Sequence, residues 1–194
     1  MYQQCSLFAD EAVTLVHDAE GSIVYHPACV PQASGALWLA ALLAQTPWRR
    51  LQRPMYERVV EVPRLVASVA LRDPARPPCI DAALARVQAV APAPYTHVGL
   101  NLYRDGRDSV APHGDRQAEL EPGWPIAIVS LGAPRDMLIR ALAGGASWRI
   151  PLEPGSLLRM SHARQRTHLH EVPKCAQALG PRISLAFRVR RSPP

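Results

Sequence analysis

Hydrophobic and polar positions along the first half of the chain predict a hairpin and two helices. Residues 13–26 alternate loosely between apolar and polar side chains around a turn at Gly21, which is typical of a β-hairpin. Residues 31–45 carry apolar side chains at helical spacing, with Ser34 as the expected N-cap. Residues 80–90 repeat the helical spacing between proline-rich flanks, so we expect a second helix there.

Strands are predicted for most of the remaining chain. The valine-rich residues 55–71 predict two strands, or one strand kinked at Pro63 and kept at a sheet edge because proline has no amide donor. From residue 95 onward, short β-like segments alternate with glycine-containing turns, a pattern typical of a sandwich or barrel. We expect these strands at residues 98–103, 126–131, 137–141, 147–151, 157–160, 168–172 and 182–189. The predicted fold class is mostly β with N-terminal helices (α+β).

Length and composition favour one globular domain in a reducing compartment. At 194 residues, with 48% hydrophobic and 20% charged residues, the chain can close one sizeable core without disulfide bonds. Its four cysteines are widely scattered and form no CxxC pair, which favours a cytoplasmic location. The N-terminal residues lack the features of a secretory signal, and the longest apolar stretch is about half the length needed to cross a bilayer. We therefore expect no association with membranes.

The net charge of +6 would suit a partner that carries phosphate groups, because basic surfaces concentrate polyanions. Lys174 is the only lysine, and the other basic residues are arginines, a skew that genome composition alone can produce. The charge therefore allows a nucleic-acid partner without requiring one.

The triplet His113-Gly114-Asp115 is the first candidate for a metal site. Residues two apart on an extended segment project from the same face and can grip one metal ion together. Non-haem Fe(II) oxygenases use two histidines and one carboxylate, which leaves positions open for a cosubstrate and dioxygen. The third ligand could be His162, His168 or His170, and spacing alone does not choose among them.

The last predicted strand has one polar and one apolar face. One face carries Arg182, Ser184, Ala186 and Arg188, and the other carries Ile183, Leu185, Phe187 and Val189. The two arginines lie about 20 Å apart along the strand, and side chains that lean toward each other would leave a gap of roughly 6 Å. That gap is close to the length of a dicarboxylate, which the arginine fork binds bidentately. Two solvated arginines on an edge strand explain the pattern equally well.

Asn101 and Tyr103 repeat this alternation in the segment GLNLYRDG. Both side chains fall on one strand face, with Leu100 and Leu102 on the other. A tyrosine hydroxyl is a suitable third hydrogen-bond donor for a dicarboxylate. A strand with one wet face is the alternative interpretation.

Four ordered blocks resemble the AlkB family of Fe(II)/2-oxoglutarate dioxygenases. They read NLYRDGRDSVAPHGD, PIAIVSLGAPRDMLIR, LEPGSLLRMSHARQRTHLHEVPK and GPRISLAFR, and they span about residues 95–190. The resemblance implies that His170, just ahead of Val172-Pro173, is the third metal ligand beside His113 and Asp115. It also implies that 2-oxoglutarate contacts the following polar residues, with Arg182 and Tyr103 at its distal carboxylate: Asn101, Tyr103, Arg182, Ser184 and Arg188.

The fold implied by the resemblance is the double-stranded β-helix, or jelly roll. We expect a single AlkB-like dioxygenase domain in residues 1–194, with residues 1–94 as an N-terminal extension and substrate lid and residues 95–190 as the catalytic core. The implied cofactor and cosubstrates are Fe(II), 2-oxoglutarate and O2. The implied reaction couples decarboxylation of 2-oxoglutarate to hydroxylation of a carbon-hydrogen bond, and an N-hydroxymethyl product then releases formaldehyde.

The substrate implied by the best-known members of the family is an alkylated base in DNA or RNA, flipped out of the stack. No obligate protein partner is implied. Gln117 stands where the family often has an acid that contacts the base, and His168 stands where many members have tryptophan. Residues 57–94 contain no aromatic side chain to stack on a flipped base, which leaves Tyr56, Trp48 or Trp124 for that role. We expect Gln117, Trp124 and Tyr56 to contact the substrate.

Two alternatives to base demethylation follow from these departures. An AlkB-like oxygenase could act on a protein side chain, a tRNA modification or a small molecule. A jelly-roll binding module without turnover would differ from both, although the complete set of candidate ligands and arginines argues against it.

Overall fold

The structure is a computed structural model that describes residues 3–4, 11–55 and 58–191. Two helices of ordinary length lie in the first half of the chain: α1 (Gln32–Gln45) and α2 (Pro78–Val90). Two short turns of helix follow, the 3-10 helix η1 (Gln117–Glu119) and α3 (Arg164–Thr167). The strands are β1 (Gln3–Gln4), β2 (Val13–Asp18), β3 (Gly21–His26), β4 (Arg49–Met55), β5 (Arg58–Ala70), β6 (His97–Tyr103), β7 (Val110–His113), β8 (Ile126–Gly132), β9 (Arg135–Ala141), β10 (Ser147–Leu152), β11 (Leu157–Met160), β12 (His168–Val172) and β13 (Arg182–Arg188).

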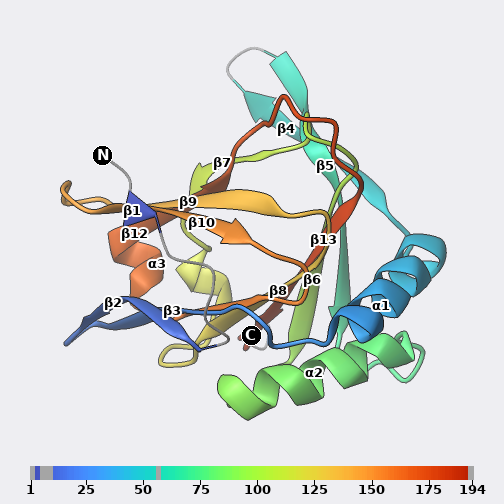
Figure 1. The fold of residues 1–194 in the computed structure, drawn as a ribbon, viewed down its shortest axis with the longest axis horizontal. Coiled ribbons are helices and arrows are strands. Elements are labelled where there is room, and N and C mark those ends of the chain that lie inside the picture. The colour runs from blue at the N-terminus through green and yellow to red at the C-terminus, as the bar shows by residue number, and fades with distance from the viewer. Residues whose placement is uncertain (1–2, 5–10, 56–57, 192–194) are drawn as a thin grey trace.

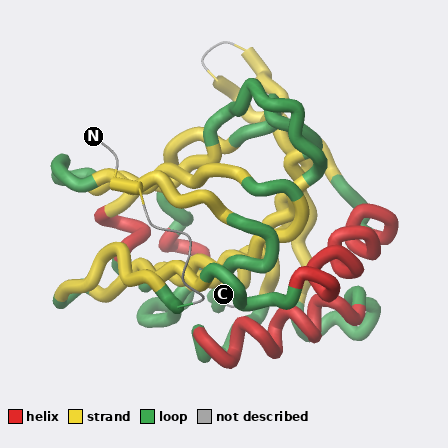
Figure 2. The backbone as a smooth tube through the Cα atoms, viewed as in Figure 1, coloured by secondary structure: helices red, strands yellow, loops and turns green. Residues whose placement is uncertain are grey.

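The strands form two sheets that face each other (Figure 1). The larger sheet has the order β2-β3-β11-β8-β13-β6-β5-β4, and the smaller has the order β1-β10-β9-β12-β7. Helices α1 and α2 lie on the outer side of the larger sheet, as Figure 2 shows by the separation of red and yellow segments. This arrangement is a jelly roll with N-terminal helices, so the predicted fold class is confirmed.

Two apolar clusters hold the three layers together. Ile183, Leu185 and Phe187 of β13 pack with the helices on one side of the larger sheet. Ala186 of the same strand faces the other way, into a cluster between the two sheets that includes Ile139. Fully burying one large apolar side chain contributes about 1.5 to 3 kcal/mol, so the alternation along β13 fixes which of its faces meets the helices. The predicted polar face of this strand therefore points between the sheets.

The predicted hairpin and helices agree with the observed elements, with one correction at a helix start. Strands β2 and β3 pair around the turn at Gly21, whose φ of 112° glycine adopts without strain. Helix α1 begins at Gln32 after Pro31, and no side chain caps it, so Ser34 lies inside the helix and is not its N-cap. Pro31 occupies the N-cap position with an extended backbone, so the helix begins at Gln32 without a polar side chain at its N-terminus.

The prediction for residues 55–71 was wrong about the sheet edge. Residues 58–70 form one strand, β5, which pairs with β4 on one side and with β6 on the other. Pro63 is tolerated because the register with β4 shifts between Arg50 and Gln52 and because pairing with β6 begins only at Leu65. The proline thus lies at an irregularity of the ladder and not on an edge strand.

Segments from before residue 95 contribute to the larger sheet. Strands β2 and β3 join it through β11, and β5 joins it through β6. The division into an extension with a lid and a catalytic core remains a prediction. None of the helices in the described part of the chain is long and apolar enough to cross a membrane.

Candidate metal and cosubstrate site

Strands β7 and β12 bring two of the predicted metal ligands together. The two strands are antiparallel, and His113 is directly opposite His170, with ring centroids 4.3 Å apart. Asp115 comes two residues after His113, the last residue of β7, so its side chain lies on the same side as that of His113. The ligand atoms of His113, Asp115 and His170 all lie within 4.8 Å of one another. Among the described residues, this is the one cluster of histidine, cysteine or acidic side chains with metal-binding spacing.

Burial sets the protonation of these groups. It lowers the pKa of His113, and burial together with the neighbouring His113 lowers the pKa of His170 to about 3. Both imidazoles are therefore neutral near pH 7, which is the form that binds metal ions. Burial acts to raise the pKa of Asp115, but the charge and hydrogen bond of Arg188 outweigh it and leave the pKa below its ordinary value. The triad offers two neutral nitrogens and one carboxylate.

Arg188 contacts the triad directly. Its Nε donates to Oδ2 of Asp115 at 2.7 Å, and the Asp115 side chain is only 10% exposed. Gly99 on the paired strand β6 leaves room for the guanidinium, because a Cβ there would lie 3.0 Å from Nη1 of Arg188. The sequence argument made Arg188 one arm of a dicarboxylate clamp, whereas the structure pairs it with the triad carboxylate.

The other two histidine candidates lie outside the triad. His168 shares a strand with His170, but its ring packs near Trp148, with centroids 5.9 Å apart, and its Nδ1 lies 2.9 Å from Oγ1 of Thr167. His162 precedes α3 and is not part of the cluster of ligand atoms. The structure thus brings together the three residues that the family resemblance implied, and their role as metal ligands remains a prediction.

Arg182 lies between the sheets as a buried cation. It is 1% exposed, and its Nη2 donates to Oγ of Ser130 at 2.9 Å. Its Nε and Nη1 have no hydrogen-bond partner within the described part of the chain. Its Cζ lies 5.1 Å from the centroid of the Tyr103 ring. Burial lowers the pKa of Arg182, which reflects the cost of holding this charge away from water.

A dicarboxylate fits this arrangement. Buried donors without acceptors are costly, and a carboxylate satisfies them best. It can accept two parallel hydrogen bonds from the guanidinium, one from Nη2 and one from Nη1 or Nε, which have no partner among the described residues. The triad supplies two histidines and one carboxylate, a donor set that leaves coordination positions open on Fe(II). The residues present therefore fit both a bound iron ion and 2-oxoglutarate.

Asn101 and Ser184 contact each other on adjacent strands near this site. Nδ2 of Asn101 donates to Oγ of Ser184 at 3.3 Å, in agreement with their cross-strand register. Oδ1 of Asn101 accepts from Nε of Arg64 on β5 at 2.9 Å. The amide is thus held from both ends, with its donor side toward β13.

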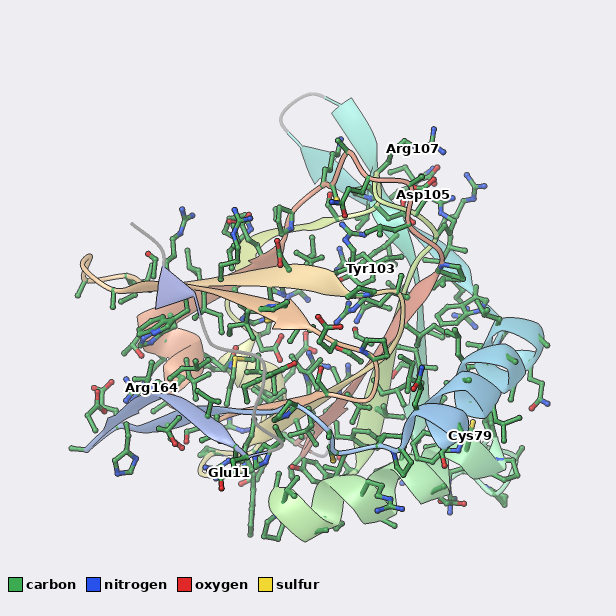
Figure 3. The ribbon with its side chains drawn as sticks, viewed as in Figure 1. Glu11, Cys79, Tyr103, Asp105, Arg107 and Arg164 are labelled. Carbon is green, nitrogen blue, oxygen red and sulfur yellow. The ribbon has the colours of Figure 1, made fainter. Side chains whose placement is uncertain are left out.

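Sequence reasoning missed Arg135, which begins β9. Its guanidinium donates to the carbonyl oxygens of Asp105, Asp108 and Pro173 at 2.9, 2.8 and 2.6 Å. Its Cζ lies 5.6 Å from the centroid of the Tyr103 ring. Figure 3 labels Tyr103 and Asp105 in this part of the molecule. Arg135 therefore joins the loop that leads into β7 to the loop that leaves β12, and both of these strands carry triad residues. Its partners are backbone atoms, so no sequence pattern could predict these contacts.

The three residues predicted to contact substrate are dispersed or not described. Gln117 is half-buried in η1, just after Asp115. Trp124 is 40% exposed in the turn before β8, and none of the described contacts joins it to the triad. Tyr56 lies outside the described residues. Their role in substrate binding remains a prediction.

A jelly roll that gathers two histidines, one carboxylate and a buried arginine with unsatisfied donors is typical of the non-haem iron oxygenases. Sequence comparison agrees: residues 22–188 match the profile of the 2OG-Fe(II) oxygenase superfamily. The chain belongs to this superfamily, and membership implies Fe(II), 2-oxoglutarate and O2 as cofactor and cosubstrates.

The curated relatives include AlkB-type proteins, which confirms the AlkB-like resemblance. The DNA oxidative demethylase ALKBH2 of Homo sapiens is 38% identical over 110 residues, which cover 53% of this chain and 42% of that protein. The alpha-ketoglutarate-dependent dioxygenase alkB homolog 3 of Mus musculus is 37% identical over 97 residues, which cover 45% of this chain and 34% of that protein. The chain thus matches less than half of the length of either relative.

Solved structures support the fold. A structure described as OsALKBH1 superposes with a TM-score of 0.58 at 15% identity and covers 86% of this chain and 97% of that chain. A Pseudomonas putida prolyl-4-hydroxylase gives a TM-score of 0.58 at 17% identity and covers 87% of this chain and 92% of that chain. Identities this low show a shared fold and leave the substrate open.

Proposed function

We propose that this chain is an Fe(II)/2-oxoglutarate-dependent dioxygenase with its metal on His113, Asp115 and His170. One observation carries the proposal. Arg182 is buried between the sheets with Nε and Nη1 lacking acceptors, and the cluster of two histidines and one carboxylate lies in the same intersheet space. A bound Fe(II) ion would supply the activation of dioxygen that converts 2-oxoglutarate and O2 to succinate and CO2 while one oxygen atom enters the substrate.

The protein's own residues would bind and orient the reactants. Arg182 would hold the distal carboxylate of 2-oxoglutarate. The ring of Tyr103 lies against the Arg182 guanidinium, and its hydroxyl would be a further donor to that carboxylate. Asn101 and Ser184 would contact the cosubstrate from the neighbouring strand positions. Arg188 would keep Asp115 ionised and fixed in direction through their ion pair. Burial of the site between two sheets would exclude bulk water from the reacting atoms.

The proposed reaction is oxidative demethylation of alkylated bases in DNA or RNA. The relatives named as DNA oxidative demethylases support it, because the four sequence blocks shared with the AlkB family include every proposed metal and cosubstrate residue. The register across the larger sheet adds support: Arg49, Val66, Asn101 and Ser184 lie in one cross-strand row, so Arg49 shares the face of the proposed cosubstrate residues. An arginine there could contact a substrate phosphate. A cytoplasmic location belongs to the same proposal.

A non-base substrate is the second candidate. Residues 57–94 contain no Phe, Trp or Tyr, and Gln117 replaces an acid expected to contact the base. Stacking on an aromatic side chain is worth about 1 to 3 kcal/mol per base, so its loss would weaken the grip on a flipped base. A protein side chain, a tRNA modification or a small molecule would not need that stacking.

One assay separates these functions. The protein is mixed anaerobically with Fe(II) and 2-oxoglutarate and then exposed to air with a panel of methylated oligonucleotides, and succinate and formaldehyde are measured. Formaldehyde in step with succinate supports base demethylation. Succinate release that no oligonucleotide stimulates favours a non-base substrate. An absence of both products, with 2-oxoglutarate still bound, would indicate a binding module and contradict the proposed activity.

We expect nucleic-acid binding to be steeply salt-dependent and only modestly sensitive to a methylated base. Each phosphate contact contributes a slope of about −0.9 for duplex DNA in a plot of log affinity against log salt. Arg49→Gln should therefore make the measured slope shallower by about 0.9, the contribution of one phosphate contact. Arg86→Gln on α2, on the far side of the larger sheet, is the matched control and should leave the slope unchanged. No binding even at low salt would shift the proposal to a non-nucleic-acid substrate.

A further inference from the structure

Gln165 is a buried side chain that bonds to the backbone between two proposed metal ligands. It lies in α3 and is 6% exposed, and its Oε1 accepts a hydrogen bond from the backbone N–H of Asp115 at 2.8 Å. Its Nε2 faces Sδ of Met160 at 3.8 Å. The amide is therefore oriented with its oxygen toward Asp115, and the Asp115 N–H obtains its acceptor from this side chain.

The backbone of Gln165 contacts the same segment at a second point. A Cβ on Gly114 would collide with the carbonyl oxygen of Gln165, so only glycine allows this close approach. The segment from His113 to Asp115 is thus held against α3 by a hydrogen bond at Asp115 and by close packing at Gly114. Helix α3 leads directly into β12, the strand that carries His170. The same short helix is therefore bonded to the segment from His113 to Asp115 and continuous with the strand of the third proposed ligand.

The N-terminal hairpin anchors α3 in turn. Arg164 is buried and donates to the carboxylate of Asp18 and, at 2.8 Å, to the carbonyl oxygen of Gly21. Ser22 and Ser161 exchange two further hydrogen bonds of 2.9 Å, one through the Ser161 hydroxyl and one through its backbone N–H. Figure 3 shows Arg164 beside the hairpin of β2 and β3. The turn that carries Gln165 is therefore fixed by an element outside the triad strands.

We propose that Gln165 is a positioning residue for the metal site. It sets the backbone between His113 and Asp115 so that the Asp115 carboxylate meets the two imidazoles. The inference rests on the proposed function, since it assumes that these three residues bind the metal ion. Groups that orient metal ligands typically change metal affinity by about 10- to 100-fold when they are replaced.

Two substitutions separate positioning from simple packing. Gln165→Leu keeps similar bulk but leaves the Asp115 N–H without an acceptor, whereas Gln165→Glu keeps an oxygen at the same reach. Positioning predicts that the leucine variant loses about 10-fold or more in Mn(II) affinity, while the glutamate variant stays close to the unmodified protein. Packing alone predicts the reverse order, because leucine suits a buried site and a carboxylate does not.

The measurement uses the full chain and requires no turnover. The dissociation constant for Mn(II) is obtained from the electron paramagnetic resonance signal of the free ion, and urea unfolding of the metal-free protein reports stability. Arg166→Gln, an exposed neighbour in the same helix, is the matched control and should change neither quantity. Gly114→Ala should weaken Mn(II) binding as well, because it pushes the ligand segment away from α3.

The possible results are distinct. Unmodified protein that fails to bind Mn(II) would overturn both the proposed metal site and this inference. Mn(II) binding by the unmodified protein, with unchanged affinity in Gln165→Leu, would overturn the inference alone. If Gln165→Leu does not fold, Gly114→Ala and Gln165→Glu decide the matter, and unchanged affinity in the alanine variant or a large loss in the glutamate variant contradicts the inference.

Discussion

Replacement of His113, Asp115 or His170 by alanine is expected to abolish the turnover of 2-oxoglutarate. Each substitution removes one of the three side chains whose ligand atoms lie within 4.8 Å of one another, and no fourth histidine or acid among the described residues joins that cluster. Succinate release with and without substrate is the measurement. Mn(II) affinity should fall in parallel, because the ion then keeps only two protein ligands.

His168→Ala is the control for this experiment. His168 stands on the same strand as His170 and is also buried, yet it packs near Trp148 instead of His113. The variant should retain most of the turnover even if it unfolds at a lower temperature. An inactive His168→Ala together with an active His170→Ala would show that the ligand is assigned to the wrong histidine.

Arg182→Ala is expected to raise the 2-oxoglutarate dissociation constant by about 100-fold or more. One carboxylate would accept a charged hydrogen bond from Nη2 of Arg182 and another from Nη1 or Nε, which have no partner among the described residues, and losing two such bonds at about 1.5 kcal/mol each corresponds to that factor. Arg182→Lys should restore only part of the affinity, because a lysine ammonium cannot form the planar bidentate pair. The constant is measured by titration of the Mn(II)-loaded protein with 2-oxoglutarate in the absence of dioxygen.

The arginine experiment also has a matched control. Arg140 is an exposed arginine on β9, and Arg140→Gln removes a positive charge without touching the intersheet space. It should bind 2-oxoglutarate as the unmodified protein does. Normal affinity in Arg182→Ala would contradict the cosubstrate assignment, and Mn(II) affinity should remain unchanged in that variant.

The elements that could be predicted from the sequence are those with a clear period. The apolar and polar faces of β13 followed directly from alternation, whereas the location of Arg182 between the sheets was one of two interpretations of that pattern. Strands β4 and β7 were missed because each contains a proline beside polar residues and shows no alternation: Pro54 lies within β4, and Pro112 lies within β7.

The parts of the site that could not be predicted depend on contacts between distant segments. Gln165 lies in a four-residue helix that has no period to detect, and its partner Asp115 is fifty residues away in sequence. Arg135 binds backbone carbonyls of two loops, so neither its own residue type nor theirs reveals the pairing. The choice of His170 over His168 came from resemblance to a family, because both residues fall on the same strand face.

The hairpin anchor of α3 bears on how the protein folds. The bond from Ser22 to Ser161 joins residues 139 apart in sequence, and the pair of Asp18 and Arg164 spans 146 residues. Contacts of such long range form slowly, since the entropy of closing the intervening chain must be overcome before they contribute stability. We therefore expect the segment from His113 to Asp115 to reach its final place only after the N-terminal hairpin has paired with β11. On this basis we expect the proposed metal site to bind its ion late, in a jelly roll that has already formed, in contrast to small zinc domains whose folding the ion itself drives.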